Sequence, residues 1–200
     1  DSFRMYERWG RVRLRWGAPL ETIGDLTRSL RDLNRPAPIA AWAQGAHAGW
    51  DDWDGRKRRS PTPDELRVQA YHALANRVTS LYWFNLSLES LLAFPDLIEP
   101  IAQVGREIRL LEEFYLEGDA THYERLLREG ELDWDTSVIA SPRGVACFAI
   151  DLAYGPDPDE HVFRFAPPRD ATLSFPLPAY ARDIKAAWSV SAGAVTPIAF

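Results

Sequence analysis

Residues 35–44 read Arg-Pro-Ala-Pro-Ile-Ala-Ala-Trp-Ala-Gln, and residues 79–85 read Thr-Ser-Leu-Tyr-Trp-Phe-Asn. Residues 37–44 are almost continuously apolar, which is typical of a parallel strand that is covered on both faces. Residues 79–86 have the composition and the alternation of a second strand. Because a helix pattern separates them, we predict a parallel strand pair with its functional groups at the carboxyl ends.

The helix between the two strands has a clear start. Thr62 is a good N-cap, Pro63 suits the first helical position, and Glu65 completes a capping box. The preceding loop, residues 45–61, is long for a strand-helix connection, so a functional role is favoured.

The regions on either side of this unit differ in character. Leucine and isoleucine recur at helical spacing over residues 20–33, and a longer helix is predicted from residue 95 to about residue 117. Residues 118–135 are polar and read as a linker, with a short helix at 122–128. From residue 136 to residue 200 the pattern is all-β, with runs at 136–140, 145–154, 161–166, 171–177, 187–190 and 195–200. Such runs predict an antiparallel sheet or a small sandwich.

Composition narrows the class of partner. The formal net charge of -6 argues against nucleic acid, since phosphate binding needs a basic face, and the basic run at 56–59 reads as a solvated loop. No apolar run reaches membrane-spanning length, and no signal-peptide pattern opens the sequence. The single cysteine, Cys147, excludes an internal disulfide framework and reads as a small core residue. The opening residues look like the end of a strand, so we expect a fragment or a processed chain.

Three features together resemble a known family: a strand ending in Trp-Ala-Gln, a Pro-Thr-Pro-Asp-Glu-Leu-Arg helix start at 61–67, and Leu-Tyr-Trp-Phe-Asn at 81–85. They resemble the last part of bacterial glycoside-hydrolase-like (β/α)8 barrels that carry a C-terminal β-sandwich. The resemblance covers most of residues 1–117 and also includes Ala-Tyr-His-Ala-Leu-Ala at 70–75. It implies an α/β portion of a TIM barrel at 1–117, a linker at 118–135 and an antiparallel β-sandwich domain at 136–200. Two or three βα units cannot close a barrel, so the remaining strands are expected from missing residues or another chain.

One residue departs from that family. Retaining members of its largest clan carry a nucleophilic Glu at the end of strand seven, where this chain has Gln44. Glutamine cannot act as a carboxylate nucleophile, and the acid/base Glu of strand four has no counterpart here. The catalytic pair is therefore not carried over by the resemblance.

Carboxylates near the predicted pocket are the remaining catalytic candidates. Glycoside hydrolysis usually needs two of them, and the loop supplies Asp51, Asp52 and Asp54. The alternative is that these residues cap turns in an exposed loop. The loop lacks the later ligands of a calcium site, and phosphate-loop, dinucleotide and serine-hydrolase motifs are absent, so no metal or cofactor is predicted.

Aromatic and amide side chains are the substrate-binding candidates. Period two predicts that Trp42 and Trp83 turn the same way if Gln44 and Asn85 face the pocket. The indoles would stack on a sugar while the amides bind hydroxyls, or else they would fill a barrel interior. The loop adds Trp50, Trp53 and His47, the last as a hydroxyl contact or a general base.

These patterns favour a carbohydrate-active protein of glycoside hydrolase type that acts on an oligosaccharide or polysaccharide. The alternative is a non-catalytic glycan-binding or scaffold protein with a degenerate barrel site. A third interpretation makes the β tail an interaction module. A secreted or periplasmic location is favoured over the cytoplasm.

Overall fold

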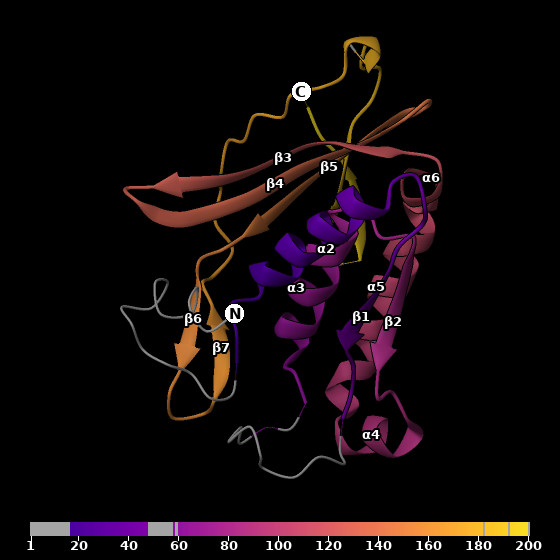
Figure 1. The fold of residues 1–200 in the computed structure, drawn as a ribbon. Helices are drawn as coiled ribbons and strands as arrows, with labels where there is room; N and C mark the ends of the chain where they lie inside the picture. Colours follow the sequence, from indigo (N-terminus) through magenta and orange to yellow (C-terminus); the bar gives the residue numbers. More distant parts are fainter. Residues whose placement is uncertain (1–16, 48–57, 59, 182, 192, 200) are drawn as a thin grey trace.

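The computed structural model describes residues 17–47, 58, 60–181, 183–191 and 193–199 (Figure 1). Its first unit is formed by α2 (Glu21–Asn34), β1 (Ala40–Gln44), α3 (Pro63–Leu74) and β2 (Ser80–Phe84). β1 and β2 pair in parallel, with Ala40 opposite Ser80 and Gln44 opposite Phe84. The predicted parallel pair is confirmed.

The start of α3 follows its sequence signal. The Thr62 hydroxyl accepts a hydrogen bond from the Glu65 N–H at 3.3 Å, and the Glu65 carboxylate accepts one from the Thr62 N–H at 2.7 Å. The second Glu65 oxygen accepts from the Phe163 N–H at 2.7 Å. The capping box therefore also joins α3 to a strand about a hundred residues later in the chain.

Helices continue after β2, and the structure then changes to antiparallel strands. The helical elements are α4 (Leu88–Ala93), η2 (Pro95–Leu97), α5 (Ile98–Leu110) and α6 (Glu112–Leu116). The largest sheet that follows has the order β3-β4-β5 and consists of β3 (Asp119–Arg128), β4 (Glu131–Ser141) and β5 (Gly144–Asp151). Among the described residues, no helix is long and apolar enough to span a bilayer.

Residues 118–135, predicted as a linker, contain β3 and the first part of β4. The short helix predicted at 122–128 is therefore wrong. Glu129 and Gly130 both have positive φ, of 53° and 87°, as tight hairpin turns require. β3 was missed because its outward residues are polar and its inward contacts include charged groups.

Two hairpins complete the described strands: β6 (Tyr154–Asp157) with β7 (Val162–Phe165), and β8 (Trp188–Ser191) with β9 (Ala194–Pro197). The predicted strand at 171–177 has no ladder partner, and prolines at 167, 168, 176 and 178 suit extended backbone without pairing. The short helix η3 (Ala179–Ala181) follows it. The partial barrel and the β-sandwich stay predictions at this level.

One hydrophobic core joins the helices to the largest sheet. Buried residues of α3 and its end, including Ala73 and Val78, cluster with Ile139 of β4 and Phe148 of β5. Figure 1 shows the β3-β4-β5 sheet lying across α2 and α3. Cys147 lies on the exposed side of β5, because strand alternation turns Phe148 inward, so its assignment to the core is wrong.

Candidate functional site

The carboxyl ends of β1 and β2 approach each other closely. The Gly45 N–H donates to the Phe84 carbonyl at 3.1 Å, which extends the ladder one residue past β1. A Cβ at Gly45 would lie 3.1 Å from both the Phe84 carbonyl oxygen and the Trp83 Cβ. Glycine is therefore needed here because the backbones are so close.

The chain turns sharply after β2. Asn85 is exposed and has a φ of 58°, a left-handed conformation that asparagine tolerates. The Ser87 hydroxyl then accepts from the Ser90 N–H at 3.1 Å and caps α4. The turn leaves Asn85 exposed at the carboxyl end of β2.

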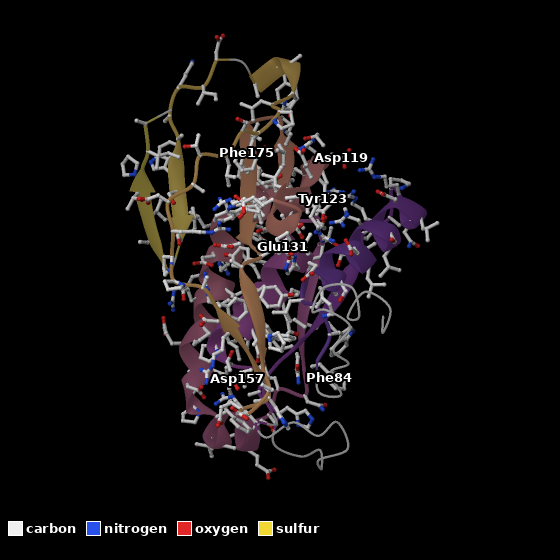
Figure 2. All side chains as sticks on the ribbon, turned by 90° about the vertical axis from the view of Figure 1, so that its left-hand side faces the viewer. Phe84, Asp119, Tyr123, Glu131, Asp157 and Phe175 are labelled. Atoms are coloured by element: carbon white, nitrogen blue, oxygen red, sulfur yellow. The ribbon has the colours of Figure 1, made fainter. Side chains whose placement is uncertain are left out.

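Three rings cover one side of the strand pair, and we call Trp42, Tyr82 and Phe84 the aromatic face. They are 67%, 49% and 39% exposed, respectively. The Trp42 ring is stacked on Tyr82 with centroids 5.2 Å apart, and it meets Phe84 edge-on at 6.1 Å. Figure 2 labels Phe84 at the carboxyl end of β2. Sequence reasoning missed Tyr82 and Phe84 because it turned Trp42 the same way as Trp83, and alternation along the strand sets Tyr82 and Phe84 on the side opposite Trp83.

Trp83 points the other way, so the predicted common orientation of the two tryptophans is wrong. The register sets Trp42 opposite Tyr82 and Trp83 opposite Ala43. Paired residues in a parallel ladder share a side, and Ala43 is buried on the side that α3 covers. Trp83 is partly buried and packs against the core between the helices and the sheet and against a smaller cluster of Ala46, Leu66 and Leu97.

Gln44 follows Trp42 on the same side of β1. Its backbone N–H is held from α3, by a 3.4 Å hydrogen bond to the Gln69 side-chain oxygen. Its side chain is partly exposed, next to the aromatic face. An amide in this place can bind a hydroxyl but cannot supply a nucleophilic carboxylate.

His47 lies at the neck of the long loop and not on an open rim. It is buried, and its N–H donates to the Ser60 hydroxyl at 2.6 Å, while that hydroxyl donates back to the His47 carbonyl at 3.1 Å. These two bonds bring the ends of the loop together. The other loop candidates lie outside the described residues, namely Trp50, Asp51, Asp52, Trp53 and Asp54.

Arg58 holds the returning end of the loop, which the sequence did not indicate. Its guanidinium donates to both oxygens of Asp96, at 3.0 and 2.8 Å, and to the Pro61 carbonyl at 3.1 Å. It also lies over the Phe94 ring at 5.0 Å. A run of basic residues gives no signal for such a tether, because the partners come from a distant segment.

A cavity of about 930 Å³ lies away from these strand ends. Its lining comes from the start of α2, the β3-β4 turn and the β6-β7 hairpin, and includes Glu21, Arg125 and Tyr154. The described candidates of the strand ends do not line it. Among the described residues, no group of three or more metal-ligating side chains occurs.

Comparisons with protein family models, with curated proteins and with solved structures found no match for this chain. The described site thus consists of an exposed aromatic face, an amide beside it, and an exposed asparagine at the rim. It can bind a ligand that has both apolar surfaces and hydroxyl groups.

Proposed function

We propose that this chain is part of a carbohydrate-active protein of glycoside hydrolase type, in which the carboxyl ends of β1 and β2 face the substrate. The observation that carries this proposal is the aromatic face, with Trp42 stacked on Tyr82 and open to solvent. Rings held on a sheet can bind the apolar faces of sugars, and in this proposal the amides of Gln44 and Asn85 bind hydroxyls.

The proposal includes further strands around this pair. Parallel sheets are ordinarily covered on both faces, but α3 covers only the side that carries Ala43 and Trp83. As strands seven and eight of a (β/α)8 barrel, β1 and β2 would gain neighbours from residues beyond this sequence or from another chain. Those neighbours would also supply a general acid and base.

Gln44 favours a second candidate, a non-catalytic glycan-binding or scaffold protein. It ends β1, where the family resemblance leads us to expect a carboxylate. Such a protein would keep the aromatic face and bind sugars without cleaving them.

The test measures oligosaccharide binding by the full chain. Isothermal titration with cello-, xylo-, laminari- and malto-oligosaccharides would be run on the wild type, on Trp42→Ala, and on Trp188→Ala as the control. Trp188 is a matched control because it is 59% exposed and lies on the separate β8-β9 hairpin. We expect binding to be lost in Trp42→Ala and kept in Trp188→Ala.

Reducing-sugar release from the same oligosaccharides separates the two candidates. Release supports the hydrolase, and binding without release supports the glycan-binding protein. No binding by the wild type, or an equal loss in both variants, would overturn the role of the aromatic face.

A further inference from the structure

A cluster of buried and partly buried charged and polar groups joins the helices to the β3-β4-β5 sheet, and we call it the interface network. α2 contributes Glu21, Asp25 and Arg28, and α3 contributes His72. β3 contributes Tyr123 and Arg125, and β4 contributes Asp135. Figure 2 labels Tyr123 where β3 meets α2.

Asp135 is the centre of the interface network and is 4% exposed. Arg125 donates to both of its oxygens, at 2.7 and 2.9 Å, and the Tyr123 hydroxyl donates to one of them at 3.0 Å. Arg125 also reaches Asp25 at 3.2 Å, which ties β3 to α2. Arg28 pairs with the same Asp25 and lies 3.2 Å from the Tyr123 ring centroid.

His72 lies within the interface network, but its ring makes none of the network's hydrogen bonds. Its residue surface is 0% exposed, and neither ring nitrogen has a hydrogen-bond partner among the described residues. An Asp135 oxygen lies 3.5 Å from Nδ1, and the same oxygen accepts a hydrogen bond from Arg125. A proton on His72 would therefore create a fully buried imidazolium whose Nε2–H has no acceptor among the described residues.

The charges around His72 set two effects against each other. The network formally holds three carboxylates, of Glu21, Asp25 and Asp135, and two guanidiniums, of Arg28 and Arg125. A proton on His72 would bring the formal net charge of the network to zero. The free-energy cost of removing the imidazolium from water is larger than this electrostatic gain. Burial is the main cause that lowers the pKa of His72 to about 4. The carboxylates of Asp135 and Glu21 raise this pKa, and the guanidiniums of Arg125 and Arg28 lower it.

We propose that the interface network is an acid-sensitive lock between the helices and the β3-β4-β5 sheet. The two layers stay docked while His72 is neutral. They separate when His72 takes up a proton, because an opened interface lets water hydrate the imidazolium. The Ser137 hydroxyl donates a hydrogen bond to the Ala75 carbonyl at 2.7 Å across this interface. This hydrogen bond is lost when the two layers separate.

Hydrogen-deuterium exchange of the full chain at pH 7.5 and pH 5 tests the lock, after correction for the intrinsic pH dependence of exchange. In the wild type, the opening constant of α3 and β4 amides should rise about 30-fold between these pH values, given an open-state histidine of ordinary pKa. His72→Leu should abolish the rise, since leucine is buried without a titrating group. The control His122→Gln, which removes a more exposed histidine of β3, should retain it.

Three results would overturn the proposal. One is an equal rise in the wild type and in His72→Leu. Another is the absence of a rise in the wild type. The third is an equal opening constant for the amides of α3 and β4 and for those of β1 and β2 at both pH values, which would indicate unfolding of the whole chain. If His72→Leu does not fold, an NMR titration of the His72 ring decides: a midpoint below pH 5 supports the lock, and one near 6.5 overturns it.

Discussion

The aromatic face and the interface network both lie on elements that pack against α3. In both regions the usual pattern, with apolar side chains buried and charged side chains exposed, is reversed. The aromatic face exposes large apolar rings, whereas the interface network buries charged groups. Exposed rings cost little to remove and remain available to a ligand. Buried charges depend on one another, so the loss of one partner leaves another uncompensated. The first region is suited to binding, and the second is suited to holding two layers together.

The largest effect should follow from Asp135→Ala. This change leaves Arg125 without its principal partner, and breaking a buried pair costs about 3–5 kcal/mol. Urea denaturation would measure the free energy of unfolding. The control is Asp32→Ala, because Asp32 pairs with Arg31 at the surface and exposed pairs contribute less than about 1 kcal/mol. Equal losses in the two variants would contradict the central role of Asp135.

The next effect concerns the pH dependence of stability. The folded-state pKa of His72, about 4, lies below its unfolded value, so the unfolded chain binds a proton first as the pH falls. His72 therefore costs no stability above about pH 6.5 and costs about 3 kcal/mol once the pH reaches 4. Denaturation curves of the wild type and His72→Leu should diverge over this interval, since carboxylates common to both cancel. Parallel curves would refute the assignment.

A smaller effect is expected where the two strand ends meet. Gly45→Ala puts a Cβ 3.1 Å from the Phe84 carbonyl oxygen and should cost about 1–2 kcal/mol, because backbone must shift. The same substitution at Gly105 meets nothing within 4 Å and should stabilise α5 by about 0.5–1 kcal/mol. Thermal unfolding of both variants measures this contrast. A neutral Gly45→Ala would mean that the strand ends are less closely joined.

The smallest effect on stability should come from Trp42→Ala. The ring is 67% exposed, so its removal should change the free energy of unfolding by less than about 1 kcal/mol. Trp83→Phe should cost more, because Trp83 packs against the core. Chemical denaturation of both variants provides the measurement. A larger loss from Trp42→Ala would show that the aromatic face belongs to the core and not to a binding surface.

The sequence predicted helix starts and turns correctly where residues close together in the chain determine the local structure. Thr62 and Glu65 form the predicted capping box, and the break between the predicted strand runs at 136–140 and 145–154 is the Ser-Pro-Arg-Gly turn between β4 and β5. The polar stretch at 118–135 was misread because β3 owes its stability to Arg125 and Tyr123 meeting Asp135, and not to apolar alternation.

The sequence by itself determined the parallel strand-helix-strand unit and the amides that end its strands, because helix caps and strand composition act over a few residues. Only the tertiary structure decided which tryptophan is exposed, since the register of β1 against β2 sets Trp42 beside Tyr82 and sends Trp83 towards α3. The interface network was also beyond the sequence. Its members lie up to about a hundred residues apart, and no periodicity links charges that meet only when the sheet docks on the helices.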